Sequence, residues 1–205
     1  MTGHDDLAPA DNPFSARHVR PGAIPYRFPP GESSETLLAR LGQAGWRGQI
    51  VGPHGSGKST LVAALLPLVE QAGVPAVLVE LHDGQRTLPV DLQRTRLAPR
   101  TLVVVDGYEQ LSILSRARLC WCCRRKRLGL LVTTHRPVRL PVLFETRTGP
   151  DLANRLVREL LAGEAEFVEP EEVSRRLEEH GGNLREVLFD LYDLYEQRRM
   201  QRRDR

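Results

Sequence analysis

The stretch IVGPHGSGKSTLV, residues 50–62, places three glycines and a lysine close together between two apolar segments. Gly52, Gly57, Lys58 and Ser59 match the pattern G-x-x-x-x-G-K-[ST], a phosphate-binding loop known as the P-loop or Walker A motif. Glycines let successive backbone N–H groups turn toward one point and form a concavity for an anion. A helix that begins near Gly57 would add the positive end of its dipole. The pattern therefore predicts a loop that holds phosphate groups.

Each polar side chain of this loop has an expected role. Lys58 would reach the β- and γ-phosphates of a nucleotide, and the Ser59 hydroxyl would ligate Mg²⁺. Thr60 would contact the α-phosphate. The remaining loop residues expected to line the nucleotide are Pro53, His54, Gly55 and Ser56. A glycine-rich turn between a strand and a helix, with no ligand, is the alternative; the apolar strand before it and the amphipathic helix after it favour nucleotide binding.

A second candidate site follows the apolar run TLVVVDG, residues 101–107. A hydrophobic strand that ends in an acid is typical of the Walker B motif, in which Asp106 would hold the magnesium shell. An ordinary buried strand with a capping aspartate is the alternative. Glu109 is the leading candidate for polarising an attacking water, although a solvated glutamate at a helix N-terminus fits equally well. Glu80, at the end of the preceding apolar run, is a weaker candidate.

The segment LLVTTH, residues 130–135, predicts another strand with polar residues at its end. Ligands bind beyond the carboxyl ends of strands in open α/β sheets. Thr134 or His135 is therefore expected to sense the γ-phosphate. A surface histidine at a strand end is the alternative for His135.

These residues need a framework of alternating strands and helices. Nearly continuous apolar runs predict buried parallel strands, with a further strand over 140–146; the runs are 47–51, 75–81, 101–107 and 128–135. Helical patterns occupy 33–46, 58–73 and 108–127, and residues 82–100 form a polar connection with room for a short helix. The order predicts an α/β fold with a mostly parallel sheet flanked by helices.

Composition and the pattern of apolar residues divide the sequence into four parts. Residues 1–35 are rich in proline and predict an extended or partly disordered arm. Residues 36–149 form the α/β core. Residues 150–198 contain three amphipathic helical patterns and form a small helical domain, and residues 199–205 are a basic, solvated tail.

Together these motifs resemble the AAA+/STAND group of P-loop ATPases over residues 36–198. TLVVVDGYEQL is similar to the Walker B of NACHT-type signalling ATPases, and LLVTTH occupies the position of sensor 1. GGNLRE, residues 181–186, resembles the sensor 2 segment of AAA+ lids, which implies that Arg185 enters the nucleotide pocket. A surface arginine after a helix cap is the alternative. Gly107 stands where AAA+ proteins usually carry a catalytic glutamate. The resemblance implies that residues 150–198 form a lid, and that the ligands are ATP and Mg²⁺.

Three functions follow from these observations. The first is a Mg-dependent ATPase that acts as a nucleotide-driven switch on a protein or nucleic-acid partner, with a homo-oligomer possible. The second is a small-molecule P-loop kinase, for which the basic segment CRRKR, residues 123–127, is a candidate part of the acceptor pocket; a solvated basic helix face is the favoured alternative for this segment. The third is an ATP-binding regulator associated with DNA that does not hydrolyse ATP. The lack of an N-K-x-D motif favours ATP over GTP.

The composition restricts which ligands and which cellular compartment we expect. The net charge of +3 is too small to indicate nucleic acid by itself. Lys58 and Lys126 are the only lysines among 29 basic residues, and the rigid fork of arginine cannot replace a compact ammonium in a tight loop. Three cysteines in CWCC, residues 120–123, lack a second ligand pair for zinc and are expected to be structural. No long apolar run or signal-peptide core is present, so we expect a cytoplasmic protein without a membrane span.

Overall fold

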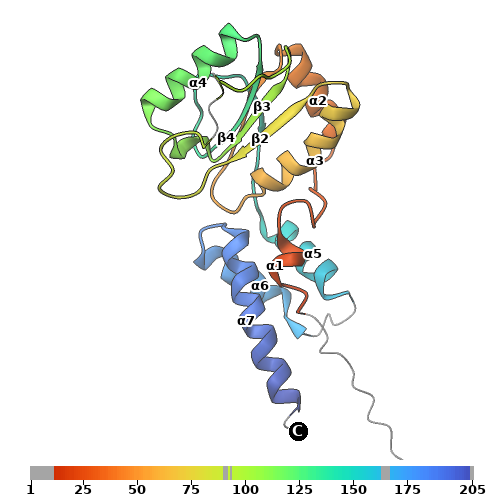
Figure 1. Cartoon of the computed structure of the whole chain (residues 1–205). Helices are drawn as coiled ribbons and strands as arrows, with labels where there is room; N and C mark the ends of the chain where they lie inside the picture. Colours follow the sequence, from red (N-terminus) through yellow and green to blue (C-terminus); the bar gives the residue numbers. More distant parts are fainter. Residues whose placement is uncertain (1–11, 90–91, 93, 163–166, 204–205) are drawn as a thin grey trace, which may run out of the picture. The chain divides into compact units, whose positions relative to one another are not determined.

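The computed structural model describes residues 12–89, 92, 94–162 and 167–203. These residues group into two compact units, and each is described by itself (Figure 1). The sheet unit spans residues 25–147. The helical unit joins residues 12–24 to residues 148–203.

The sheet unit is built on five strands that all run parallel, in the order β2-β3-β4-β1-β5. The strands are β1 (Arg47–Val51), β2 (Ala76–Glu80), β3 (Leu102–Asp106), β4 (Gly129–Thr134) and β5 (Val142–Glu145). This confirms the predicted α/β class with a parallel sheet flanked by helices. Because every strand points the same way, the carboxyl ends meet at one side of the sheet, the carboxyl edge, and the amino ends meet at the opposite side, the amino edge.

Helices cover both faces of the sheet, which explains why most positions of its central strands β3 and β4 are apolar. Alternate residues of a strand face opposite sides. Val103 and Val105 pack with α4 (Ile113–Arg125), and Leu102 and Val104 pack in a second cluster with other helices. The helices of that second face are α2 (Ser34–Gln43) and α3 (Lys58–Gln71). Figure 1 shows α4 on one side of the strands and α2 and α3 on the other.

The amide side chain of Gln49 lies fully inside the sheet unit. Gln49 of β1 has no exposed surface, and its amide group donates to the carbonyl oxygen of Val138 over 2.9 Å and also to that of Leu140. Its side-chain oxygen accepts from the Val138 N–H over 2.8 Å. These bonds satisfy a buried amide and hold the segment that leads into β5 against β1.

Serine side chains cap the N-termini of two helices of the sheet unit. Ser33 accepts a hydrogen bond from the Thr36 N–H, and the Thr36 hydroxyl accepts one from the Ser33 N–H, which forms a capping box for α2. The helix predicted over 108–127 is divided in the structure into a 3₁₀ turn, η1 (Tyr108–Gln110), and α4. The break occurs because Leu111 is extended and Ser112 caps α4 through the Ser115 N–H.

The proline-rich segment is not a separate arm where the structure describes it. Residues 25–35 belong to the sheet unit, where the rings of Tyr26 and Phe28 pack edge-on against each other and against Phe144 of β5. Residues 12–24 belong to the helical unit. Burial of these aromatic rings compensates for the poor helical and strand propensity of the segment. Residues 1–11 of the predicted arm lie outside the described residues.

The helical unit has its own core, formed by α1 (Ala16–Val19), α5 (Pro150–Leu161), α6 (Pro170–Glu179) and α7 (Leu184–Arg203). Phe14 is buried in this core and meets the ring of Tyr195 edge-on. The Asn12 amide donates to the carbonyl oxygen of Tyr192 and to the carboxylate of Glu196. These contacts attach the N-terminal segment to α7.

Two further predictions differ from the structure. The described residues of the connection 82–100 form turns and bends but no helix, and residues 90, 91 and 93 lie outside them. The basic segment from residue 199 to residue 203 continues α7 rather than forming a tail, and residues 204–205 lie outside the described part. In the described part of the chain, no helix is long and apolar enough to cross a membrane.

Glu172 of α6 is the centre of an ion-pair network in the helical unit. Its carboxylate lies 3.2 Å from a guanidinium nitrogen of Arg176 and 3.1 Å from one of Arg198. Arg176 also pairs with Asp190, which contacts His180 at 2.7 Å. Burial acts to raise the pKa of Glu172, but the hydrogen bonds and charges of Arg176 and Arg198 outweigh it and lower the pKa.

We expect Glu172→Gln to lower the free energy of unfolding by about 1–2 kcal/mol at pH 7. The folded-state pKa of Glu172 lies below its unfolded value, so its contribution is present above that value and is lost as the pH falls through the folded-state pKa. Urea unfolding at pH 7 and at about pH 3 checks this, and the difference between variant and parent should shrink at the lower pH. The exposed neighbour Glu171 provides the control: Glu171→Gln should change stability by less than about 0.5 kcal/mol. An equal loss in both variants would contradict the network.

Candidate nucleotide site

The loop 52–57 connects β1 to α3 and curls around a buried lysine. Lys58 is the first residue of α3, and its ammonium group donates to the carbonyl oxygens of Gly52 over 2.8 Å and Pro53 over 2.6 Å. Gly57 precedes it with φ +89°, a left-handed conformation that a β-carbon disfavours. The loop therefore ends at the N-terminus of a long helix, where unpaired amide groups attract an anion.

A hydroxyl pair supports this loop from β5. Thr146, which directly follows β5, is buried, and its Oγ1 lies 2.6 Å from Oγ of Ser56. Ser56 Oγ also donates to the Pro53 carbonyl oxygen over 2.8 Å. A β-carbon on Gly52 would lie only 2.0 Å from Thr146 Oγ1, so only glycine fits this close approach. The loop is therefore held in shape by its own residues and by the neighbouring strand.

Asp106 ends β3 in a fixed turn. Oγ1 of Thr133, on the adjacent strand β4, donates to the Asp106 carboxylate and accepts the Gly107 N–H over 2.9 Å. Gly107 has φ +83°, and a β-carbon there would lie 2.8 Å from the carbonyl oxygen of Leu81. Position 107 therefore excludes residues that carry a β-carbon, glutamate included.

The two threonines at the end of β4 have different surroundings. They are adjacent in the strand and so face opposite sides of the sheet. Thr133 contacts Asp106, whereas Oγ1 of Thr134 donates to the carbonyl oxygen of Arg136 and accepts the Arg136 N–H. The hydroxyl that the sequence assigned to phosphate sensing, on Thr134, is therefore engaged by its own loop. Thr133 is the threonine that contacts the aspartate.

Glu109 is held by a histidine that also contacts the P-loop. Glu109 lies in η1, and its Oε1 is 3.0 Å from Nε2 of His135. The ring of His135 lies against the ring of His54, with centroids 3.6 Å apart. Oε2 of Glu109 is buried and has no hydrogen-bond partner among the described residues. The structure thus brings Glu109, His135 and the P-loop together, with one carboxylate oxygen left for another donor.

Burial and nearby charges shift the pKa values of His135 and Lys58. Burial, the Lys58 ammonium and His54 lower the pKa of His135 to about 4. The ring is therefore neutral at pH 7, and Nε2 must carry the hydrogen that faces the carboxylate of Glu109. Burial lowers the pKa of Lys58, while the carboxylates of Glu109 and Asp106 act to raise it. Lys58 therefore lies within the electrostatic reach of both acids.

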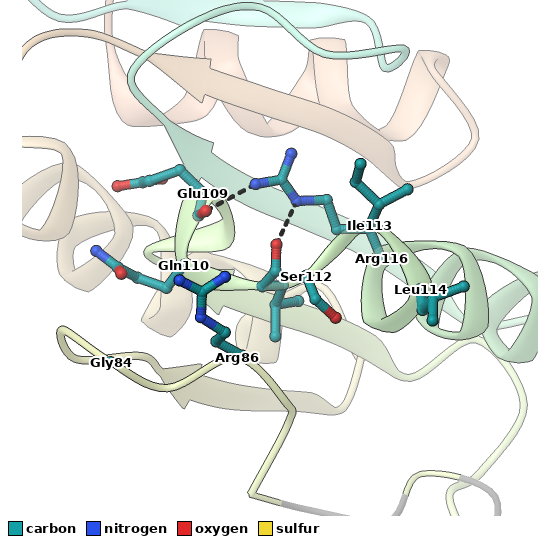
Figure 2. A pocket seen from close by; sticks show the side chains of 9 residues that line it. Gly84, Arg86, Glu109, Gln110, Ser112, Ile113, Leu114 and Arg116 are labelled. Atoms are coloured by element: carbon teal, nitrogen blue, oxygen red, sulfur yellow. Dashed lines mark hydrogen bonds between the residues drawn. The ribbon is translucent and has the colours of Figure 1, made fainter.

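A cavity of about 520 Å³ borders Glu109, and no residue of the loop 52–57 lines it. Figure 2 shows the Arg116 guanidinium at its wall, where it donates to the backbone carbonyl oxygen of Glu109 over 2.7 Å. Arg116 also donates to the carbonyl oxygen of Leu111 and lies over the ring of Tyr108. These contacts fix the turn that carries Glu109.

The other predicted site residues are distributed as follows. Ser59 and Thr60 lie half-buried in the first turn of α3, beside Lys58, and Gly55 is in the left-handed region with φ +65°. Glu80 is exposed at the end of β2, opposite Asp106 in the register. Arg185 is exposed in the first turn of α7, within the helical unit, and its contact with a nucleotide stays a prediction.

Sequence reasoning missed three residues that shape this site. Thr133 was recognised only as part of a strand end. Thr146 lies at the end of the strand predicted over 140–146, and Tyr26 lies in the proline-rich segment. The Tyr26 ring lies 3.3 Å from the position of a β-carbon on Gly57, and burial raises its pKa to about 12. Alternating aromatic residues in Tyr26-x-Phe28 were the available signal for a packed, extended segment.

Comparison of the chain with models of protein families and with curated proteins gives no match. The interpretation of this site therefore rests on its residues and their geometry.

We expect Gly107→Ala to lower the free energy of unfolding by about 2–3 kcal/mol, because the new β-carbon is both in a left-handed backbone and too close to a backbone oxygen. Gly84→Ala is the matched control: Gly84 has a similar φ of +87° but open space around it, so we expect a loss of about 1 kcal/mol. Urea unfolding of the three proteins measures both values. Equal losses at the two positions would show that the close contact with Leu81 does not matter.

Proposed function

We propose that this chain binds a magnesium–ATP complex at the carboxyl edge of its sheet and hydrolyses ATP as a switch acting on a macromolecular partner. One observation carries the proposal. The P-loop with its buried Lys58, the Asp106–Thr133 pair and the Glu109–His135 pair lie at neighbouring strand ends of one parallel sheet. The strand order supports this arrangement because β4 separates β1 from β3 and brings its own side chains between them.

The residues present fit this ligand. The loop amides and the N-terminus of α3 suit phosphate oxygens, and the close approach of Gly52 to Thr146 preserves the shape of the loop. The Ser59 hydroxyl and the Asp106 carboxylate supply oxygen donors, which are the ligands that Mg²⁺ prefers. A bound magnesium ion would neutralise phosphate charge that develops during transfer. Lys58 would exchange its two carbonyl partners for phosphate oxygens.

Glu109 is the residue proposed to handle the proton. His135 donates to its Oε1 and so orients the carboxylate, while the unpartnered Oε2 is available to accept a proton from water. The neutral state of His135 suits this role, because a neutral ring stabilises the carboxylate as a hydrogen-bond donor without pairing it with a full positive charge. His54 connects this pair to the P-loop through its ring contact.

The kinase alternative loses support from the position of the segment 123–127. This segment ends α4 and leads into the amino end of β4, and Arg124 and Arg127 line a cavity together with the residues that start β1 and β4. The P-loop follows the carboxyl end of β1. The basic segment and the P-loop therefore lie at opposite edges of the sheet, so the segment cannot build an acceptor pocket beside the phosphates.

We expect Lys58→Ala to weaken ATP binding by about 30-fold or more, because the phosphates lose their embedded cation. Isothermal titration calorimetry with magnesium and ATP measures the affinity. Lys126, the only other lysine, serves as the control: its ammonium donates to backbone oxygens of the connection 82–100. Lys126→Ala should keep ATP affinity within about threefold. Full ATP affinity in the Lys58 variant would refute the nucleotide site.

We expect Glu109→Gln to slow ATP turnover by about 10²–10⁴-fold while ATP affinity changes little, because only the proton acceptor is removed. Phosphate release measured with saturating ATP separates the two effects. Glu80→Gln, which alters the weaker candidate, should leave turnover unchanged. Equal loss of binding and turnover would contradict the role of Glu109, and tight binding by a parent protein without turnover would support the non-hydrolysing regulator instead.

A further inference from the structure

A second cavity of about 520 Å³ lies at the amino edge of the sheet. Its walls come from the residues that precede and begin β1, from the loop before β3, from the end of α4 and from the start of β4. Among the described residues, no acidic side chain lines it, and four arginines do: Arg47, Arg100, Arg124 and Arg127. The cavity therefore concentrates positive charge at the edge opposite the P-loop.

Among the described residues, no carboxylate pairs with the guanidinium groups of these four arginines. None forms a hydrogen bond or ion pair with a described residue, whereas Arg176 and Arg198 each pair with a carboxylate. Arg47 is half-buried and its charge acts to lower the pKa of the Cys123 thiol, which burial raises overall to about 12. Like charges gathered around one cavity repel one another unless an anion lies between them.

The backbone around this cavity is strained. Trp46, Arg100 and Arg127 have φ values of +61°, +67° and +55°, and the described residues contain only one other non-glycine residue with positive φ. All three line the cavity, and the Arg100 N–H donates to the Arg127 carbonyl oxygen over 3.1 Å. Bulky residues in this conformation persist where the surrounding structure requires them, and they are concentrated at binding sites.

The basic character extends from the cavity along α4. From the start of α4 to the turn after it, residues 113–127, the sequence has six arginines and lysines and no acidic residue, although the whole chain has a net charge of only +3. Trp121, on the same helix as Arg124, is 52% exposed, and the Arg125 guanidinium lies 5.1 Å from the centre of its ring. An exposed aromatic face beside a basic surface is the combination that stacks unpaired bases and neutralises their phosphates.

We infer that the amino edge is a binding site for single-stranded nucleic acid. The arginines of the cavity contact backbone phosphates, and the exposed ring of Trp121 stacks on a base. This goes beyond the proposed nucleotide site and does not depend on it. An acidic protein segment would be attracted by the same charges, but it has no bases to stack on the exposed indole ring. Trp121 therefore favours nucleic acid as the ligand.

The test measures binding of a fluorescent single-stranded oligonucleotide of about 20 nucleotides to the full chain, without ATP, by anisotropy from about 50 to 200 mM salt. Three to four arginine–phosphate contacts predict a slope of about −2 to −3 in a plot of log affinity against log salt. Arg100→Asn with Arg127→Asn should weaken binding about tenfold or more and make the slope shallower by about 1.4. Asparagine tolerates the left-handed backbone, so the fold should persist.

A control removes the same charge elsewhere. Arg155 and Arg158 are exposed on α5 of the helical unit, and Arg155→Gln with Arg158→Gln should change oligonucleotide affinity by less than about twofold. Thermal unfolding compares the stability of both double variants with the parent. Equal weakening by the two double variants would overturn the assignment of the site, because it would reflect net charge alone.

Two further measurements identify the ligand and separate this inference from the proposed ATPase. Trp121→Ala should weaken binding of the oligonucleotide about five- to 50-fold without changing the salt slope. Unchanged affinity in this variant, or displacement by polyglutamate or inorganic tripolyphosphate at concentrations as low as those of unlabelled oligonucleotide, would overturn recognition of nucleic acid. Lys58→Ala should keep full oligonucleotide binding, so failure of the ATP site would leave this result intact.

Discussion

The parallel sheet can hold polar chemistry only at its two edges, because helices cover both of its faces. Leu102, Val103, Val104 and Val105 have no exposed surface, and an ionised group in their place would face a large desolvation cost. Gln49 lies inside only because every hydrogen-bonding atom of its amide has a backbone partner. Charged side chains are therefore concentrated where the strands begin and end. The parallel arrangement decides which of these side chains become neighbours.

At the carboxyl edge, one threonine organises the turn on which the proposed catalysis depends. Thr133 holds the Asp106 carboxylate and the Gly107 amide at once, and the backbone that results admits only glycine at position 107. The acid proposed to activate water is therefore carried two residues further on, in the 3₁₀ turn. His135 contacts the Glu109 carboxylate, and Arg116 binds the backbone of the same turn. Glu109 therefore lies close to the P-loop although it is not the residue next to the aspartate in the sequence.

The two edges use different cations for physical reasons. The P-loop closes around Lys58, whose compact ammonium fits between two carbonyl oxygens where a planar guanidinium would not. The amino edge instead has four arginines around an open cavity, where forked, weakly hydrated groups suit extended phosphate surfaces. If both proposals hold, the strands between the edges connect a nucleotide site to a nucleic-acid site.

The sequence alone was enough to predict the α/β class, because most positions in the strands are apolar and the P-loop lies between a strand and a helix. It could also nominate Lys58, Asp106 and Glu109, since their residue types and local context do not depend on distant contacts. It could not predict that Tyr26 packs against Phe144, or that Thr133 rather than Thr134 contacts Asp106, because each contact joins residues far apart in the chain. The arginine cavity shows this most clearly. Its four members lie between residues 47 and 127 and become neighbours only because strand amino ends and the end of α4 meet at one edge.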